Sequence, residues 1–349
     1  MSFERLKTLQ GTINYFAERT IEGMGKQLSF VIPCYNEVGN VEAIFEAIRA
    51  VFEPEGIDYE AVMVNDGSRD GTREKLKKLF LAHPDGRLRV VDFSRNFGKE
   101  AAIYAGLQNA KGERVCIIDA DLQQRPEVAF EMYKILDEHP EYDCVAAYQE
   151  RRKEGKVLSF FKNCFYRLIN RMCDIDFIQG ASDFRMFRRN MADAILSVGE
   201  YHRFSKGIFS WVGFDTFFMP YEVQERNSGS SKWSFFKLFR YAIDGIIGYS
   251  TVPLKISTVL GTLLSVFAVV YMIVLVIKTL ILGIDVPGYV TTLGFVLLLG
   301  GIQLMILGIL GEYLSRVYIQ GKNRPIYVVK EILEGKENGE SVDISAEEK

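Results

Sequence analysis

The stretch LSFVIPCYNEVGNVEAIFEAIRAVF, residues 28–52, begins with a short apolar run and ends with a helical pattern. The apolar run, Leu28–Cys34, contains β-branched residues and predicts a buried strand. A polar loop follows, and apolar residues then recur at helical spacing, at Val41, Ile44, Phe45, Ile48 and Phe52. The stretch therefore predicts a strand, a loop and a helix in that order.

The same pattern recurs along the next hundred residues. Predicted strands cover residues 61–64, 88–93 and 115–118, and each is followed by polar residues and a helical pattern, the last opening at Pro126. A further strand is predicted at 144–148. Repeated units of this kind form a mainly parallel α/β sheet, which binds ligands beyond the carboxyl ends of its strands. Neither G-x-G-x-x-G nor G-x-x-x-x-G-K occurs, so neither a dinucleotide site nor a P-loop is favoured.

Carboxylates follow the predicted strands at the edge where ligands bind. Asp66 follows one strand, and Asp119 and Asp121 follow another. Residues i and i+2 of an extended segment point to the same face, so we expect Asp119 and Asp121 to aim two carboxylates at one point. Oxygen ligands suit a hard cation such as Mg²⁺ or Mn²⁺. The alternative is an acidic turn that only caps the next helix.

Charged residues are distributed unevenly along the 349-residue chain, whose net charge is −3. Only four occur in residues 251–315, and the apolar runs at about 256–282 and 286–311 are each long enough to cross a membrane as a helix. They predict a transmembrane hairpin, with a buried core helix as the alternative. Lys255 precedes the first apolar run and Arg316 follows the second, whereas the turn holds no Lys or Arg, which predicts that both termini are cytoplasmic.

These patterns divide the chain into five parts. We expect an N-terminal extension over 1–26, an α/β domain over 27–230, an interfacial helix over 231–249, the hairpin over 250–315 and a cytoplasmic tail over 316–349. They exclude a purely cytosolic enzyme and, at pI 5.8, a protein built to hold nucleic acid. Three histidines and five cysteines without a C-x-x-C pair leave little material for a zinc site or a Ser-His-Asp triad.

Three motifs in order resemble the signature of family 2 glycosyltransferases, the inverting, nucleotide-sugar-dependent class with a GT-A fold. They are VIPCYNE at 31–37, VNDGSRDGT at 64–72 and DADLQ at 119–123. More narrowly, the chain resembles the polyprenyl-phosphate sugar transferases related to dolichyl-phosphate mannose synthase, above all the bacterial bactoprenol (undecaprenyl-phosphate) glucosyltransferases. Besides the hairpin, the supporting blocks are SRNFGKE at 94–100, GASDFR at 180–185, RNSGSSKW at 226–233 and RPIY at 324–327.

The resemblance implies roles for the matching residues in binding the sugar donor. The residues implied to hold the nucleoside, with the last near the base, are Pro33, Tyr35, Glu37, Val64 and Asp66. Those implied to face the diphosphate are Asp119, Ala120 and Asp121. Asp121 with Gln123, beside Asp119, would hold Mg²⁺ or Mn²⁺. Arg226 and Lys232, on a flexible loop, would close over the phosphates.

Two positions depart from the family pattern. Asn65 stands where relatives often have an aspartate, and Gln124-Arg125 replace a commoner Asp-Pro pair. Both changes leave the Asp-x-Asp core intact. We expect them to alter the residues around that core or the sugar preference.

A basic amphipathic segment follows the strand at 144–148. Arg151 and Arg152 lead into mixed aromatic and basic residues, which suits a helix on an anionic membrane surface, although an ordinary packed helix is the alternative. A lipid phosphate is largely dianionic at neutral pH and can attack without first losing a proton. We expect Arg151, Arg152 and Arg185 to bind this phosphate. Asp183 resembles the acidic residue often proposed as a base in the family, and a role in orienting Arg185 or the sugar is equally open.

The leading interpretation is transfer of a hexose from a UDP-sugar to undecaprenyl or another polyprenyl phosphate, for modification of cell-envelope glycans. Glucose is expected ahead of N-acetylglucosamine, and the reaction is placed at the cytoplasmic face of the inner membrane. A processive polysaccharide synthase is disfavoured because no Q-x-x-R-W motif occurs. A non-catalytic nucleotide-sugar sensor is disfavoured because the Asp-x-Asp motif and both loop cations are present. We further expect a homo-oligomer such as a tetramer, a separate flippase and no nucleic-acid partner.

Overall fold

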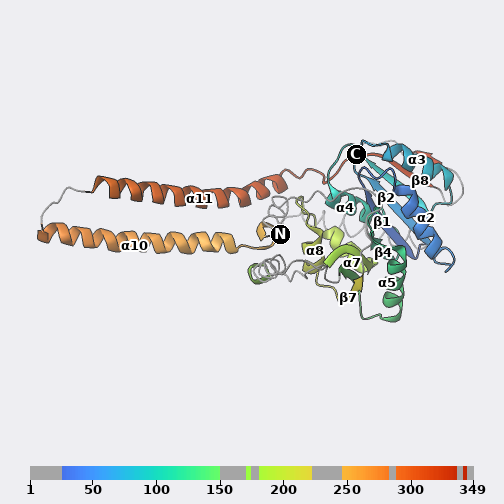
Figure 1. Ribbon diagram of the computed structural model, residues 1–349, viewed down its shortest axis with the longest axis horizontal. Helices are drawn as coiled ribbons and strands as arrows, with labels where there is room; N and C mark the ends of the chain where they lie inside the picture. Colours follow the sequence, from blue (N-terminus) through green and yellow to red (C-terminus); the bar gives the residue numbers. More distant parts are fainter. Residues whose placement is uncertain are drawn as a thin grey trace, which may run out of the picture. The chain divides into compact units, whose positions relative to one another are not determined.

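The computed structural model describes residues 26–149, 170–173, 181–221, 246–282, 288–335 and 341–343. The chain forms two compact units, an α/β unit that includes the C-terminal residues from Pro325 onward and a helical unit with two long helices (Figure 1).

The α/β unit alternates strands and helices in its first half, as the sequence predicts. Its elements in chain order are β1 (Leu28–Cys34), α2 (Val41–Phe52), β2 (Tyr59–Asn65), α3 (Thr72–Ala82), β3 (Leu88–Phe93), α4 (Lys99–Asn109), β4 (Arg114–Ile117), α5 (Pro126–Glu138), β5 (Cys144–Gln149), β6 (Ala181–Arg188), α7 (Arg189–Ser197), α8 (Ser205–Trp211), β7 (Thr216–Tyr221), β8 (Val329–Gly335) and β9 (Ser341–Asp343).

A single nine-stranded sheet in the order β7-β5-β6-β4-β1-β2-β3-β8-β9 forms the centre of this unit. The four central strands, β4, β1, β2 and β3, are parallel to one another. Their outer neighbours β6 and β8 are antiparallel to them, so the whole sheet is mixed. The parallel centre confirms the predicted α/β class, and it gathers the carboxyl ends of four strands at one edge.

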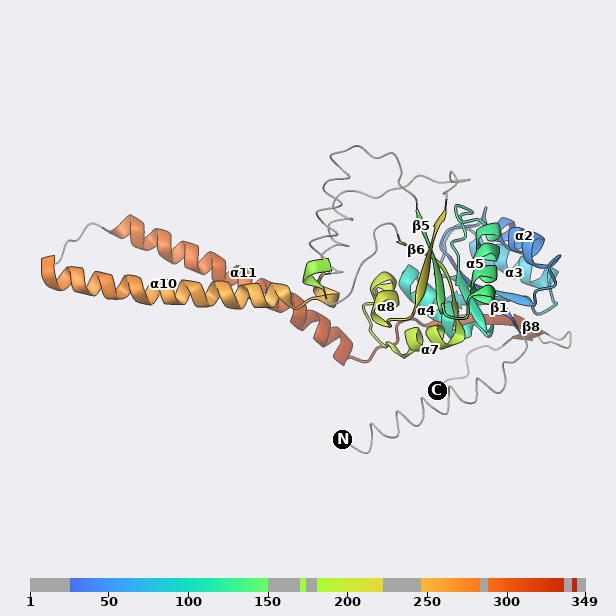
Figure 2. The same ribbon diagram turned by 90° about the horizontal axis from the view of Figure 1, so that it is seen from below.

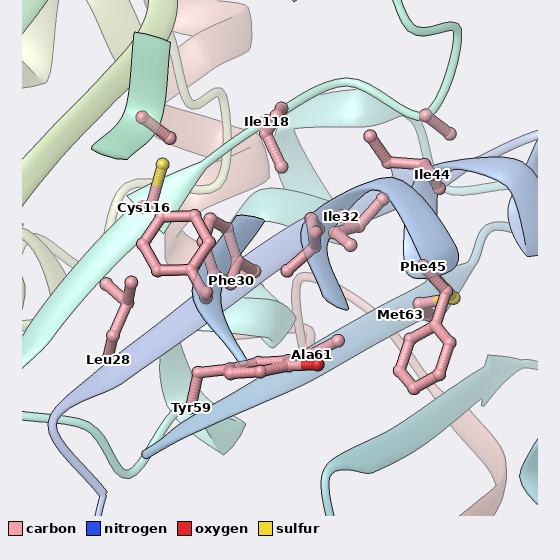
Figure 3. Close-up of a cluster of buried hydrophobic side chains, with 14 of the residues drawn as sticks. Leu28, Phe30, Ile32, Ile44, Phe45, Tyr59, Ala61, Met63, Cys116 and Ile118 are labelled. Atoms are coloured by element: carbon pink, nitrogen blue, oxygen red, sulfur yellow. The ribbon is translucent and has the colours of Figure 1, made fainter. Parts of the chain in front are cut away.

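Alternate residues of β1 face two different layers of helices. Phe30 and Ile32 belong to a buried cluster that includes apolar side chains of α2, α3 and α5 (Figure 3). Val31 points to the opposite face, where a Cβ added at Gly106 of α4 would lie only 2.3 Å from its Cγ1 atom. Because α4 approaches the sheet this closely, the helix needs a glycine at that position. The sheet is therefore covered on both faces (Figure 2).

Part of the predicted C-terminal tail, 316–349, belongs to the sheet. β8 pairs with β3, and the Ser94 amide donates to the Val328 carbonyl at 3.0 Å. The Tyr327 ring stacks on Phe93 with centroids 4.8 Å apart, and its hydroxyl donates to the side chain of Gln108 at 2.6 Å. The RPIY block thus ends in an aromatic anchor that brings the chain back to the α/β unit.

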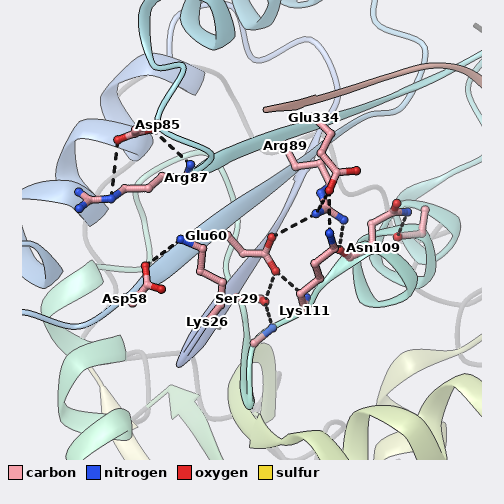
Figure 4. Close-up of polar contacts among 12 residues, drawn as sticks. Lys26, Ser29, Asp58, Glu60, Asp85, Arg87, Arg89, Asn109, Lys111 and Glu334 are labelled. Atoms are coloured by element: carbon pink, nitrogen blue, oxygen red, sulfur yellow. Dashed lines mark hydrogen bonds and ion pairs between the residues drawn. The ribbon is translucent and has the colours of Figure 1, made fainter. Parts of the chain in front are cut away.

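Ion pairs hold β8 along its length. Glu331 pairs with Arg73 at 2.9 Å and with Lys77 at 2.7 Å. Glu334 pairs with Arg89 at 2.5 Å and with Lys111 at 2.8 Å (Figure 4). All four cations come from residues 73–111, so the contacts that order the strand join segments more than 200 residues apart in the sequence.

Acidification is expected to loosen β8. The hydrogen bond from Lys77, opposed by partial burial and reinforced by Arg73, lowers the pKa of Glu331 from its ordinary 4.5. This stabilisation is therefore complete above about pH 4.5 and is lost as the pH falls through the lowered pKa. Between pH 7 and pH 3 we expect amide exchange in β8, corrected for intrinsic rates, to accelerate about fivefold, equivalent to about 1 kcal/mol for these partly exposed pairs.

A substitution separates this effect from general acid denaturation. Glu331→Gln is expected to exchange faster than the parent at pH 7 and to lose part of the pH dependence in β8. The remainder is expected from Glu334, because burial would raise its pKa but Lys111 and Arg89 hold that pKa below its ordinary value. Glu74→Gln, which changes an exposed side chain of α3, serves as the control. Equal protection of β8 in the parent protein at both pH values would exclude this role for Glu331.

The helical unit contains α10 (Val252–Leu282) and α11 (Tyr289–Gly321). Each contains a span long and apolar enough to cross a membrane, Val252–Val274 and Leu298–Gly321. These spans overlap the predicted 256–282 and 286–311, and the turn at 283–287 lies outside the described residues. The Tyr313 hydroxyl donates to the Ser250 carbonyl at 2.6 Å, which ties α11 to the residues before α10.

Candidate functional site

The loops after β1 and β2 are joined by hydrogen bonds at the carboxyl edge of the sheet. Asn36 has a φ of 58°, and its amide donates to the Ser68 hydroxyl at 3.0 Å while its side-chain oxygen accepts from the Arg69 amide at 2.9 Å. An asparagine tolerates this left-handed conformation better than most residues. Tyr35, beside it, is 47 % exposed and free to present its ring to a ligand.

Pro33 lies in a central strand, where proline is unusual. The Asp66 amide donates to the Cys34 carbonyl, so the backbone polar groups of Cys34 point toward β2. Those of Pro33, one residue earlier, therefore point toward β4. Pairing with β4 ends at Ile117, before it reaches Pro33. The missing N–H therefore leaves no hydrogen bond of the sheet unmade, and contact of Pro33 with a nucleoside stays a prediction.

The other residues implied to hold the nucleoside have structural partners in this structure. Val64 is buried, so only its backbone can face a nucleoside; Ala120, which is implied to face the diphosphate instead, is buried as well. The Glu37 amide donates to the Thr72 hydroxyl at 2.9 Å, and its carboxylate accepts from the Asn40 side chain at 2.6 Å. Their contacts with a nucleoside stay predictions.

Asp66 anchors the loop that follows β3. It is only 3 % exposed, and its carboxylate accepts from the amides of Phe97 at 2.6 Å and Gly98 at 3.0 Å. Burial raises the pKa of Asp66, and these two amides oppose the rise. A Cβ at Gly67 would lie 2.3 Å from the Arg95 backbone, so the two loops touch. Asp66 therefore shapes this part of the site, and its predicted place near a base is untested.

The first departure from the family pattern has a physical explanation. The side-chain amide of Asn65 donates to the Asp92 carboxylate at 2.6 Å, and Asp92 also pairs with Arg73 at 2.7 Å. A carboxylate at position 65 would stand against that of Asp92 and repel it. An amide can donate instead, so Asn65 suits a chain that has Asp92 at the end of β3.

Lys99 joins two of the predicted catalytic carboxylates. Its ammonium lies 2.7 Å from Asp119 and 3.2 Å from Asp183. Burial opposes the charge on Lys99, but Asp119 and Asp183 outweigh it and raise the pKa of the lysine. The side chain is 44 % exposed, so the cluster is open to a ligand. Asp119 and Asp183, which are 64 residues apart in the sequence, thus belong to one site.

The electrostatics of this cluster favour an ionised Asp183. Burial alone would raise its pKa, but Lys99, Lys206 and Arg185 together hold the pKa below the ordinary value. Behind the cluster, Glu100 accepts from the amide and hydroxyl of Ser205, and burial raises the pKa of that glutamate. The start of α4 therefore faces the site with Lys99 and anchors α8 with Glu100.

Gln124, the second departure from the family pattern, holds Asp119 from the other side. Its side-chain oxygen accepts from the Asp119 amide at 2.8 Å, and its amide nitrogen donates to the Asp119 carboxylate at 3.2 Å. With Lys99 on one oxygen and Gln124 on the other, Asp119 has a fixed orientation. Gln124 thus forms part of the surroundings of the Asp-x-Asp core, and its effect on the sugar preference stays a prediction.

Asp121 lies in a turn and not in an extended segment. β4 ends at Ile117, and residues 120–121 form a turn. Leu122, which follows directly, has a φ of 60°. The Asp121 carboxylate accepts from the Gln123 amide at 3.2 Å. The strand alternation used to align Asp119 with Asp121 was therefore the wrong geometry. Left-handed conformations of bulky residues are strained and concentrate at functional sites.

Arg185 is a buried neighbour of Asp183. It is 5 % exposed, donates to the Ser182 carbonyl at 2.9 Å and stacks its guanidinium 3.7 Å from the centre of the Phe209 ring. The charge of Arg185 acts on Asp183. This interaction fits a role for Asp183 and Arg185 in orienting one another better than it fits direct contact of Arg185 with a large acceptor. Contact of Arg185 with the acceptor phosphate stays a prediction.

The structure does not describe four of the cations that the sequence predicts for the site. Arg151, Arg152, Arg226 and Lys232 lie outside the described residues. Among the described residues, no group of three or more His, Cys, Asp or Glu side chains is placed to hold a metal ion.

Sequence reasoning missed Lys99 as a site residue. It is the first residue of α4, where the helix dipole disfavours a cation. A lysine there, directly after a strand-end loop, could have indicated nearby carboxylates.

Comparisons with known proteins show what the chain is similar to in sequence. The pattern described as Glycosyl transferase family 2 matches residues 29–196, and that described as GtrB C-terminal hairpin matches 252–317. The putative glycosyltransferase CsbB of Bacillus subtilis (strain 168) is 42 % identical over 304 residues, 87 % of this chain and 91 % of that protein. The SfII prophage-derived bactoprenol glucosyl transferase of Shigella flexneri is 35 % identical over 304 residues, 87 % of this chain and 97 % of that protein.

A remote likeness exists to the crystal structure of glucosyl-3-phosphoglycerate synthase from Mycobacterium tuberculosis in complex with Mn²⁺, UDP-glucose and phosphoglyceric acid. It is 17 % identical, has a TM-score of 0.41 and covers 66 % of this chain and 81 % of that one. The assignment rests on the sequence relatives and the two family patterns. Together with its two long apolar helices, they show that the chain is a membrane-associated enzyme that belongs to the family 2 glycosyltransferases and carries the GtrB C-terminal hairpin.

Proposed function

We propose that the chain transfers glucose from UDP-glucose to a polyprenyl phosphate such as undecaprenyl phosphate, with inversion at the anomeric carbon. Relatives named bactoprenol glucosyl transferase, 34–35 % identical over nearly their whole length, support the sugar and the lipid. The observation that carries the proposal within this chain is the Lys99 bridge between Asp119 and Asp183, next to the Asp-x-Asp turn. The two long apolar helices of the chain suit an acceptor that resides in a membrane. N-acetylglucosamine is the second candidate sugar.

The donor is expected to lie across the carboxyl ends of β1, β2 and β4. The exposed ring of Tyr35 offers a face on which a base can stack. The turn at Asp119–Gln123 would then meet the diphosphate. Arg226 and Lys232 would close over the phosphates, as the family resemblance implies.

The side-chain oxygens at this turn are suitable ligands for a hard divalent cation. Asp121 supplies carboxylate oxygen and Gln123 amide oxygen, while Asp119 is already held by Lys99 and Gln124. Mg²⁺ is commonly bound by one or two carboxylates plus substrate phosphates and water, so a full cage of protein ligands is not required. We propose Asp121 and Gln123 as the ligands, with Asp119 beside them. A metal ion bound there would stabilise the charge on the departing diphosphate.

The acceptor needs positioning more than activation. A lipid phosphate oxygen would form the new bond to the anomeric carbon, while the bond from that carbon to the UDP oxygen breaks and UDP leaves with the electron pair. Because the phosphate is largely dianionic at neutral pH, no proton has to be removed from it. We therefore propose that Asp183, held ionised by Lys99 and Lys206, orients the sugar. Arg185 would position Asp183, and Arg151 and Arg152 would meet the lipid phosphate.

The arrangement in the membrane completes the proposal. The hairpin would cross the inner membrane twice and leave both termini in the cytoplasm, as the distribution of Lys and Arg predicts. The product would then need a separate flippase to cross the bilayer. A homo-oligomer is part of the proposal on the family resemblance alone.

A donor screen tests the sugar nucleotide. Full-length protein in detergent is heated with Mn²⁺ and either UDP-glucose, UDP-N-acetylglucosamine or GDP-mannose. At 100 times its dissociation constant a ligand stabilises the folded state by about 2.7 kcal/mol, which is a readily measured shift. We expect UDP-glucose to raise the melting temperature most, and only with metal present. A larger shift with GDP-mannose would contradict the proposed donor.

A further inference from the structure

An open cavity of about 290 Å³ lies at the ends of β1, β2 and β3. Its walls come from the ends of these strands and the loops after them, from Arg73 of α3 and from Lys330 of β8. The lining includes Tyr35, Arg69, Arg73, Asp92, Arg95 and Lys330. The cavity therefore combines Tyr35, which is implied to contact a nucleoside, with a strand that the chain adds only after the hairpin.

The walls carry an excess of positive charge. Arg73 is paired with Asp92 and Glu331. Among the residues that the structure describes, no carboxylate forms an ion pair within 4 Å with Arg69, Arg95 or Lys330. Arg95 donates to the Asn96 carbonyl at 2.9 Å and lies 4.0 Å from the centre of the Phe97 ring, and Lys330 acts on Asp92 at longer range. Lysine and arginine only donate hydrogen bonds, so the group that fits here is one that presents acceptors.

Lys330 is held in place by its neighbours along β8. Glu331 is bound to α3 through Arg73 and Lys77, and Tyr327 is stacked on Phe93. The register places Glu331 opposite Asp92, beside a bulge between Asp92 and Phe93. Irregular pairing of this kind often redirects a side chain near a functional site. The backbone that carries Lys330 is thus fixed before any ligand arrives.

We propose that Lys330, with Arg69 and Arg95, recognises the carbonyl oxygens of the donor's nucleobase while Tyr35 stacks on the base. The C-terminal strand then forms part of the donor site and selects uracil. Uracil presents a carbonyl acceptor where cytosine presents an amino donor, and cationic donors reject the latter. This inference rests on the proposed function, because it assumes that a nucleotide-sugar donor occupies the strand ends.

The test is titration of full-length protein in detergent with UDP and with CDP, in Mg²⁺, by calorimetry. Loss of one charge-assisted hydrogen bond is expected to weaken UDP binding about tenfold in Lys330→Gln. Glutamine can accept as well as donate, so the preference for UDP over CDP is expected to narrow as well. Lys330→Arg should retain most of the affinity.

Kinetics and a matched control complete the design. Since the base is remote from the reacting atoms, Lys330→Gln is expected to raise KM for UDP-glucose about tenfold and to leave kcat unchanged. Lys78→Gln removes the same charge from an exposed position on α3 and should change neither value. Equal UDP affinity in Lys330→Gln and the parent would overturn the inference. Failure of the parent to bind UDP at all would instead overturn the proposed donor, and the inference with it.

Discussion

Replacing Asp121 by asparagine is expected to reduce sugar transfer at least about 100-fold, because the change removes the charge that we assign to the metal and the diphosphate. Asparagine keeps a side-chain oxygen that can accept from the Gln123 amide, as the Asp121 carboxylate does at 3.2 Å. The turn with Leu122 at positive φ can therefore persist. The loss should come from chemistry and not from unfolding.

Three measurements separate these causes. The rate of lipid-linked sugar formation should fall, the dependence of UDP binding on metal should weaken, and the melting temperature should stay within a few degrees of the parent. Asp137→Asn is the matched control, since it removes one charge from an exposed surface ion pair with Arg114. Undiminished transfer by the Asp121 variant would remove Asp121 from the metal site.

Replacing Lys99 by methionine is expected to lower kcat on the order of 10- to 100-fold, the usual cost of removing a group that orients functional side chains. Methionine keeps much of the length and loses the charge that bridges Asp119 and Asp183. Without that cation the pKa of Asp183 should rise, because burial raises this pKa and only Lys206 and Arg185 would remain to lower it. If ionised Asp183 is the active form, the acidic limb of the pH–rate profile should move to higher pH.

The pH profile distinguishes positioning from mere structure. Lys99→Arg restores the charge and should recover part of the rate and return the acidic limb toward its parental position. A Lys99→Met enzyme with reduced kcat and an unshifted profile would show that Lys99 does not act through Asp183. A variant with parental kcat would exclude any role for the bridge in transfer.

The sequence predicted the strand-end loops well because each depends on a local pattern. Leu28–Cys34 and the helical spacing after it appear as β1 and α2 with nearly the expected bounds. The motifs at 31–37, 64–72 and 119–123 do lie at the carboxyl ends of parallel strands. Repetition of one local unit was enough to place them at the same edge.

Long-range pairings were beyond this reasoning. Val329–Gly335 reads VKEILEG, which has no clear strand alternation, and its pairing with β3 depends on Glu331 and Glu334 reaching cations from residues 73–111. The bridge from Lys99 to Asp183 likewise depends on β6 lying beside β4 in antiparallel order. Neither contact has a signature within a short window of sequence.

The geometry of the Asp-x-Asp motif shows the limit of a periodicity argument. Placing Asp119 and Asp121 together assumed an extended segment, but the strand stops at Ile117 and Leu122 turns the chain at positive φ. Identifying Asp121 as a candidate ligand rested on residue type and resemblance, which do not depend on that assumption. Its surroundings, Lys99 and Gln124 around Asp119, required the structure.

One assay tests the central claim most directly. Purified full-length protein is incubated with Mg²⁺, undecaprenyl phosphate and UDP-glucose labelled in the sugar, and the organic-soluble product is isolated and its linkage assigned by NMR. The account predicts a single glucose joined through a β-linked phosphate to the lipid, formed at least about 100-fold more slowly by Asp121→Asn. A polymeric sugar product, or no lipid-linked sugar from any common sugar nucleotide, would contradict it.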